Sequence, residues 1–154
     1  MVRGRETMEE NIWNDDIEDV EPVIDAESQF LGALETLDVN RIVACWSESE
    51  QATLVFPGVD MARGPAAIRM AWVEVADHTS KLRPVVKPVS YIRMGDMGWT
   101  FLSGTLMSTH GDETLSVEVY ITNVYLRESE GWKLLHMHVA PSPHQPSYLE
   151  QRLN

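Results

Sequence analysis

Two histidines near the end of the chain, His136 and His138, have a spacing that could support chemistry. On a β-strand, residues two positions apart project from the same face. The pair could therefore act as a general acid and base, or supply two ligands to a metal ion. A metal site needs three or four ligands, and no neighbouring cluster of His or Cys supplies the others. We therefore expect no metal ion here.

The residues that alternate with these histidines indicate which face of the expected strand lines the interior. Leu135, Met137 and Val139 form the more uniformly apolar set, as expected for the lining of a pocket. We therefore expect this set to face inward and His136 and His138 to lie on the outer or dimer face. The opposite orientation is the alternative, and in that case the histidines would be the acid–base pair.

The preceding segment carries a polar residue, Asn123, within an apolar alternation. Asn123 shares its set with Val119, Ile121 and Tyr125, whereas Tyr120 belongs to the opposite set. If the first set faces a cavity, Asn123 is a polar group inside it. The alternative is that the Asn123 amide satisfies a backbone group at a β-bulge.

One segment earlier, Ser103 alternates with Trp99 and Phe101 and could add a hydroxyl to the same cavity. An amide and a hydroxyl among aromatic rings would orient a small carbonyl-bearing or oxygenated molecule. The catalytic candidates are His136, His138, Asn123 and Tyr120. The candidates for contact with a ligand, several of which could equally be core residues, are Trp46, Phe56, Trp72, Tyr91, Trp99, Phe101, Ser103, Tyr125, Met137 and Val139.

Three helices are expected in the first half of the chain. Apolar residues recur at three- and four-residue spacing behind Pro22, which suits the first turn of a helix over about 22–37. Asp38 can cap a second, short helix, and Gly64-Pro65 can open a third. Between the second and third helices, residues 52–56 are typical of a strand.

The second half of the chain is expected to form a curved antiparallel sheet. Four strands, over roughly 82–94, 96–108, 113–127 and 132–140, are separated by turn signals such as Gly95 and Gly111-Asp112. Pro84 and Pro88 confine the first of these strands to an edge or a bulged path. Helices that cross the concave face of such a sheet would leave a cone-shaped cavity. The prediction is an α+β domain over 21–141, with an acidic arm (1–20) and a proline-containing tail (142–154).

Charge and composition limit the possible partners. The formal net charge is −12, from 24 acidic and 12 basic residues, which disfavours nucleic acid and anionic membrane surfaces. The single cysteine, Cys45, excludes a disulfide framework, and nothing resembles a glycine-rich phosphate loop. We expect no bound cofactor. With no secretory signal and no long apolar segment, the expected location is cytoplasmic, by elimination.

Several segments together resemble a known family. The helical hairpin that ends in Cys45-Trp46, followed by "ATLVFPGVD" and "RGPAAIRMAW", is similar to the first half of SnoaL-like proteins. The segment "YITNVYLRESEGWKLLHMHVAPSP" is similar to the paired final strands of that family. SnoaL-like proteins form a branch of the nuclear transport factor 2-like superfamily, which also contains the association (hub) domain of calcium/calmodulin-dependent kinase. The resemblance implies a cone-shaped fold that dimerises through its sheet.

The family does not fix the function. Isomerases of the superfamily place a catalytic carboxylate just before the proline that ends the first strand, where this chain has Phe56. Phenylalanine cannot abstract a proton, so isomerase chemistry of that kind is disfavoured. Two functions are carried forward. One is a homodimer that binds a small apolar or oxygenated organic molecule, with lyase, isomerase or cyclase-type acid–base activity. The alternative is a non-catalytic dimerisation or hub module.

Overall fold

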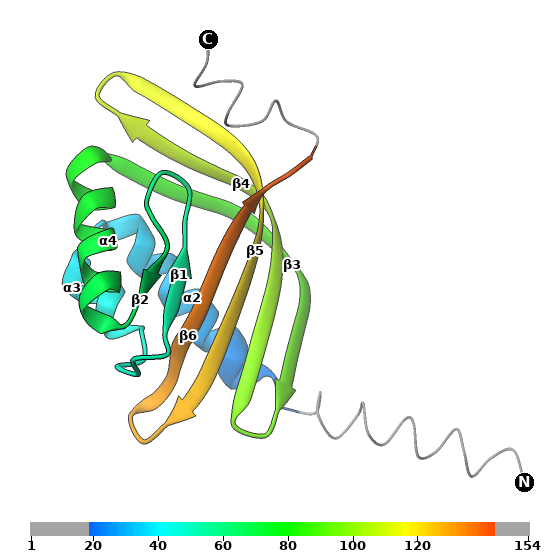
Figure 1. The fold of residues 1–154 in the computed structure, drawn as a ribbon. Helices are drawn as coiled ribbons and strands as arrows, with labels where there is room; N and C mark the ends of the chain where they lie inside the picture. The colour runs from blue at the N-terminus through cyan, green and yellow to red at the C-terminus, as the bar shows by residue number, and fades with distance from the viewer. Residues whose placement is uncertain (1–18, 144–154) are drawn as a thin grey trace, which may run out of the picture.

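The computed structural model describes residues 19–143. The expected arm and tail lie almost entirely outside them. Two helices, α2 (Glu21–Thr36) and α3 (Val39–Ala44), are followed by two short strands, β1 (Thr53–Val55) and β2 (Ala62–Arg63), and then by a third helix, α4 (Pro65–His78). Four long strands follow: β3 (Lys81–Met94), β4 (Met97–His110), β5 (Glu113–Glu128) and β6 (Gly131–Pro141). The long strands curve around the helices (Figure 1). The predicted α+β class is confirmed.

The helix starts follow from local sequence. Pro22 lies in the first turn of α2, where its missing N–H costs nothing. Asp38 caps α3, because its Oδ1 accepts hydrogen bonds from the backbone nitrogens of Asn40 at 3.0 Å and Arg41 at 3.3 Å. Pro65 opens α4 directly after Gly64, whose φ of 86° suits glycine. No helix within residues 19–143 has the length and apolarity needed to cross a membrane.

The six strands form one sheet in the order β2-β1-β6-β5-β4-β3. The pairing is antiparallel except between β1 and β6, which run parallel. Strand β3 lies at the edge, and its register shifts between Pro88 and Ser90, so the proline-based prediction of an edge or bulged path is confirmed. The two-residue strand β2 was not expected from the sequence.

The register places one row of side chains across the concave face. Leu54 on β1 pairs with Met137 on β6, Met137 with Asn123 on β5, Asn123 with Thr100 on β4, and Thr100 with Tyr91 on β3. Paired residues of neighbouring strands project to the same side. Leu54, Met137, Asn123 and Thr100 are fully buried, so this row faces the helices. It forms the floor on which the candidate site is built.

Helix α2 lies close against β4 at Gly98. A Cβ atom at Gly98 would lie 2.5 Å from Cγ2 of the buried Val23. We expect Gly98→Ala to lower the free energy of unfolding by about 1–3 kcal/mol, because α2 must move away from the strand. Gly32 is the matched control, since a Cβ there meets nothing within 4 Å. Gly32→Ala, in the middle of α2, should raise stability by about 0.5–1 kcal/mol. Urea denaturation of the two variants measures both effects, and equal stabilities would contradict the close approach.

Candidate active site

A carboxylate lies in the middle of the apolar face of α2. Val23, Glu27, Phe30 and Leu34 follow one another at helical spacing, and all four are buried. The side chain of Glu27 is 1% exposed and faces the row of side chains on the sheet. The sequence did not predict a role for this residue, since all four catalytic candidates lie on the expected strands. The signal in the sequence was an acidic residue at a helix position where the apolar repeat predicts a buried side chain.

Three strand residues donate hydrogen bonds to the Glu27 carboxylate. Thr100 Oγ1 donates to Oε1 at 2.6 Å, and Asn123 Nδ2 lies 3.0 Å from both carboxylate oxygens. The hydroxyl of Tyr125 donates to Oε2. These donors come from β4 and β5 and are buried, so the carboxylate is held in one position by side chains on two strands. We call Glu27, Thr100, Asn123 and Tyr125 the Glu27 cluster.

Burial raises the pKa of Glu27 above its ordinary value of 4.5. The hydrogen bonds from Thr100, Tyr125 and Asn123 act in the opposite direction, because they favour the ionised form, but burial prevails. A buried carboxyl group with a raised pKa can serve as a proton donor or acceptor. The amide of Asn123 can adapt to either form of the carboxyl, since a half-turn exchanges its donor and its acceptor.

The neighbouring phenols stay protonated. Burial raises the pKa of Tyr125 well above 10, and the charge of Glu27 raises it further. Burial, and then the Glu27 charge, also raise the pKa of Tyr91, which lies in the same row of the sheet. A phenol that keeps its proton is a hydrogen-bond donor throughout the physiological pH range. The cluster therefore combines a titratable carboxyl with a fixed hydroxyl donor.

Two buried polar atoms in this interior have no hydrogen-bond partner among the described residues. One is Oδ1 of Asn123 and the other is Nε1 of Trp72, a fully buried residue of α4. Trp72 packs edge-on against Phe30 at 6.3 Å and against Phe56 at 5.2 Å between ring centroids. Buried polar atoms in folded proteins nearly always have a partner, protein or otherwise. An acceptor and a donor are thus available among aromatic rings.

The pH dependence of stability should report the Glu27 carboxyl. Because its pKa is raised, the folded protein keeps a proton that the unfolded chain releases near pH 4.5. Its contribution to stability is therefore full below pH 4.5 and is lost as the pH rises through the raised pKa. Glu27→Gln cannot titrate. We expect the unfolding free energy of the unmodified protein, minus that of Glu27→Gln, to fall with pH above 4.5. A difference that stays flat or rises contradicts the raised pKa.

Comparison with known proteins assigns the family. Residues 23–143 match the family model described as SnoaL-like domain, which is most of the 154-residue chain. The chain belongs to the SnoaL-like family. Solved structures of the nuclear transport factor 2-like superfamily, some described as having a cystatin-like fold, share its architecture. No curated protein sequence matches the chain.

Three solved structures illustrate the range of the SnoaL-like fold. A candidate dehydratase of the nuclear transport factor 2-like family from Streptomyces avermitilis is 20% identical, with a TM-score of 0.73, covering 80% of this chain and 96% of its own. A candidate association domain of calcium/calmodulin-dependent protein kinase type II from Thiobacillus denitrificans is 29% identical, with a TM-score of 0.66 and coverages of 76% and 92%. A ketosteroid isomerase-like protein from Erwinia carotovora atroseptica is 14% identical, with a TM-score of 0.67 and coverages of 84% and 99%.

The SnoaL-like cone encloses only part of the residues expected in it. Asn123 belongs to the Glu27 cluster together with Tyr125, which was expected only as a ligand contact. The other expected contacts that the structure places in the interior or at its rim are Trp46, Phe56, Trp72, Tyr91, Met137 and Val139.

The expectation that Ser103 joins Asn123 inside the cone was wrong. Along β4, the buried side chains are those of Thr100, Leu102 and Leu106, so Trp99, Phe101 and Ser103 project from the outer face. The register agrees, because Ser103 pairs with Tyr120, and Phe101 stacks on the Tyr120 ring at 5.8 Å. Alternation identified the two faces of this strand, but the more aromatic set lies outside. Tyr120 likewise lies outside and does not meet Asn123.

The two histidines also lie on the outer face, so they do not meet the Glu27 cluster. His136 pairs with Thr53 and Val124, and its Nδ1 lies 2.6 Å from Oγ1 of Thr53. Partial burial lowers the pKa of His136, and the neighbouring His138 lowers it further. The two rings are perpendicular at 6.2 Å. The described residues contain no group of three or more His, Cys, Asp or Glu side chains suited to a metal ion.

A pocket of about 360 Å³ lies beside the last turns of α4, and we call it the α4 pocket. Its inner wall includes Phe56 and Val75, and Phe56 packs on Trp72. Trp72 in turn contacts Phe30, which lies one turn from Glu27 on α2. The Glu27 cluster does not line this pocket. The rings of Phe56, Trp72 and Phe30, which we call the aromatic cluster, therefore connect the wall of the pocket to the helix that carries the carboxyl.

Proposed function

We propose that the protein binds a small oxygenated organic molecule in its cone and that Glu27 exchanges a proton with it. The observation that carries this proposal is the Glu27 carboxyl, which is 1% exposed, has a raised pKa and lies beside a phenol and an amide. A titratable group with a perturbed pKa in a secluded interior is typical of catalytic sites.

Each member of the cluster has a chemical role in this proposal. Glu27 removes a proton from carbon next to a carbonyl group, or gives one to a leaving hydroxyl. Once Glu27 holds the proton, the Tyr125 hydroxyl turns from the carboxyl and donates its one hydrogen bond to the substrate oxygen, where negative charge develops. Its raised pKa keeps that proton in place. Asn123 turns its unpartnered Oδ1 to the substrate or to the protonated carboxyl, and Thr100 holds the carboxylate. The reaction class is that of a lyase, isomerase or cyclase.

Access is through the α4 pocket. Rotation of Phe56, which lines this pocket and packs on Trp72, would open a way toward the carboxyl. The unpartnered Nε1 of Trp72 is then a donor on the path of an oxygenated substrate. This arrangement favours a molecule with an apolar body and one or two oxygen atoms.

Exchange of α-hydrogens tests the proposal without knowledge of the natural substrate. Cyclohexanone in D2O is incubated with the full chain, and loss of its α-proton signal is followed by NMR. We expect exchange faster than in buffer, and Glu27→Gln should reduce it by at least about a hundredfold, as for loss of a general base. Glu35→Gln, on the exposed side of the same helix, is the control. Equal exchange rates for the unmodified protein and Glu27→Gln would falsify the proposal.

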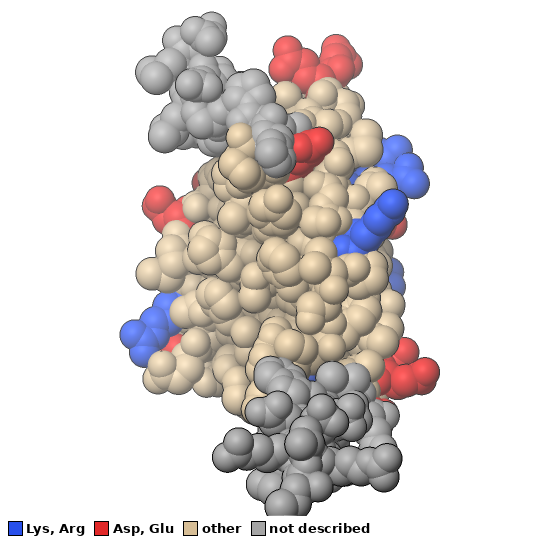
Figure 2. Space-filling model, turned by 90° about the vertical axis from the view of Figure 1, so that its right-hand side faces the viewer, with Lys and Arg blue, Asp and Glu red and all other residues tan. Residues whose placement is uncertain are grey.

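A second candidate function, dimerisation or a hub role, is favoured by the outer face of the sheet. Phe101, Tyr120 and Trp99 lie there, and the centre of this face carries few charges (Figure 2). The relative from Thiobacillus denitrificans is described as an association domain. We propose that the chain forms a homodimer through this face, which is compatible with a ligand in the cone.

Size-exclusion chromatography with light scattering tests the dimer. Phe101→Glu, in the centre of the face, should give a monomer because it buries a charge in the interface. Met70→Glu introduces the same charge at a 65% exposed position on α4 and should leave the dimer intact. A monomeric unmodified protein, or a Phe101→Glu dimer, contradicts the sheet interface.

A further inference from the structure

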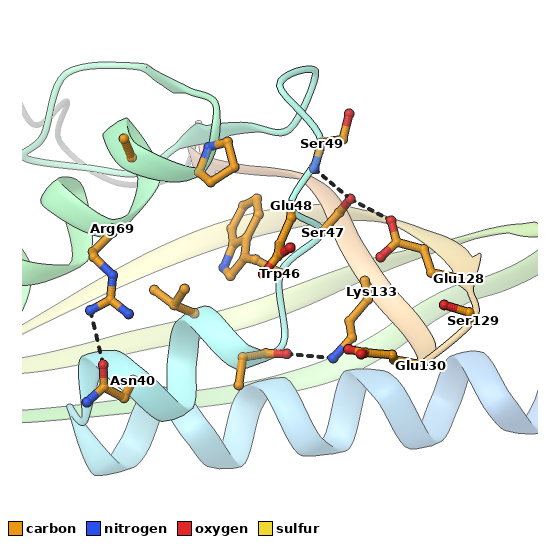
Figure 3. Close-up of a pocket in the computed structure, with 14 residues that line it drawn as sticks. Asn40, Trp46, Ser47, Glu48, Ser49, Arg69, Glu128, Ser129, Glu130 and Lys133 are labelled. Atoms are coloured by element: carbon orange, nitrogen blue, oxygen red, sulfur yellow. Dashed lines mark hydrogen bonds between the residues drawn. The ribbon is translucent and has the colours of Figure 1, made fainter.

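A second concavity lies outside the cone, between α3, the start of α4 and the turn that joins β5 to β6 (Figure 3). Its volume is about 1010 Å³, larger than that of the α4 pocket. Trp46 lies in the middle of it, with Val43 and Pro65 also in its wall. The Glu27 cluster does not line it, so its role is independent of the proton-transfer chemistry. We call it the Trp46 groove.

One end of the Trp46 groove favours an anion. Arg69 projects from α4, and its guanidinium donates to Oδ1 of Asn40 at 3.0 Å. The N-terminus of α4 also borders this end; Gly64 provides no side-chain cap, and the carboxylate of Glu50 lies beside Gly64. Nε1 of Trp46 is a second donor, and it has no acceptor among the described residues although Trp46 is only 4% exposed. An oxygen of a bound carboxylate would satisfy it.

The opposite end of the groove favours a cation. Glu128 and Glu130 lie there in the turn between β5 and β6, and Glu48 lies nearby (Figure 3). The ammonium group of Lys133 donates to the carbonyl oxygen of Ala44 at 2.8 Å. Within residues 19–143 the one ion pair closer than 4.0 Å joins Arg93 to Asp19, outside this groove. Lys133 lines the same end but forms no ion pair within 4.0 Å with these carboxylates, and Glu128 accepts a hydrogen bond from Ser47 Oγ at 2.7 Å.

We propose that the Trp46 groove binds a small zwitterion that carries a carboxylate and an ammonium group at the two ends of an apolar body. The carboxylate lies against Arg69 and Nε1 of Trp46, the ammonium group against Glu128 and Glu130, and the apolar body over Trp46. A phosphate dianion fits poorly, because the lining contains three glutamates against one arginine and one lysine. The separation of opposite charges along one groove selects a molecule with the same separation.

Binding of 6-aminohexanoate to the full chain tests the proposal, with hexanoate and hexylammonium as half-ligands. The indole 15N–1H signal of Trp46, identified with Trp46→Phe, is followed by NMR. We expect 6-aminohexanoate to shift this signal at a concentration about tenfold or more below either half-ligand, because each charged hydrogen bond contributes to binding. Equal affinity for hexanoate, or no shift with 6-aminohexanoate up to 50 mM, overturns the proposal.

Matched variants assign the two ends. Arg69→Gln and Glu130→Gln change exposed side chains of the groove, and each should weaken 6-aminohexanoate binding about tenfold. Arg69→Gln should also weaken binding of hexanoate, whereas Glu130→Gln should weaken binding of hexylammonium. Arg83→Gln and Glu113→Gln alter exposed residues of β3 and β5 that do not line the groove, and they should leave the affinity unchanged. Equal losses in groove and control variants indicate nonspecific charge effects and overturn the proposal.

Discussion

The Glu27→Leu variant is expected to lose at least about 3 kcal/mol of unfolding free energy. Leucine has a similar volume, but Thr100, Asn123 and Tyr125 would lose their common acceptor. A buried donor left without a partner costs about 1–3 kcal/mol, and these three donors are excluded from solvent. Urea denaturation at a fixed protein concentration measures the loss.

Two further variants separate lost hydrogen bonds from lost packing. Glu27→Gln keeps an acceptor oxygen for the same donors and should retain most of the stability that Glu27→Leu loses. Adding Tyr125→Phe to Glu27→Leu removes one orphaned hydroxyl and should restore about 1 kcal/mol. If Glu27→Leu is as stable as the unmodified protein, the hydrogen bonds of the Glu27 cluster contribute nothing net to folding.

Trp72→Ala is expected to lower the unfolding free energy by about 3–5 kcal/mol. Trp72 is fully buried and joins Phe30 on α2 to Phe56 at the end of β1, so alanine leaves a cavity in the middle of the aromatic cluster. A cavity of that kind lies on the proposed path to Glu27. Xenon or benzene binding, detected by NMR, would report whether it forms.

Trp72→Phe is the matched control. It keeps an aromatic ring against Phe30 and Phe56 and removes the Nε1–H that has no acceptor among the described residues. Its loss of stability should be well below that of Trp72→Ala. If Trp72→Phe lost as much stability as Trp72→Ala, the Nε1–H would have to form a stabilising hydrogen bond. Its acceptor would not be one of the described residues.

Much of the fold could be predicted from the sequence, because helix caps, prolines and turn residues act on the backbone within a few positions. Asp38 caps α3, and Pro84 and Pro88 mark an edge strand, as their backbone chemistry requires. The two-residue strand β2 has no such signal. It exists because the chain after β1 folds back on that strand, pairing Thr53 with Arg63.

The candidate site was less predictable, because tertiary packing decides which face of each strand lies toward the helices. Alternation separates Thr100 from Phe101, but only the position of α2 decides which of them is inside. A register shift at Val124 and Tyr125 also places both Leu134 and Met137 in the core, which strict alternation along β6 forbids. Glu27 was missed for a related reason, since periodicity predicts the buried face of a helix and not which polar residue on it will find partners.

The sequence separations within the Glu27 cluster have a consequence for the order of folding. The hydrogen bonds of Glu27 span 73, 96 and 98 residues, from the first described helix to the fourth and fifth strands. Closing such long loops is costly in chain entropy. The hydrogen bonds can offset this cost only when the β4–β5 hairpin has already formed. The cluster should therefore assemble after β4 and β5 have paired, when α2 docks on them. The same carboxyl would then act as a latch of the native state, setting how slowly the protein opens and having little influence on how fast it forms.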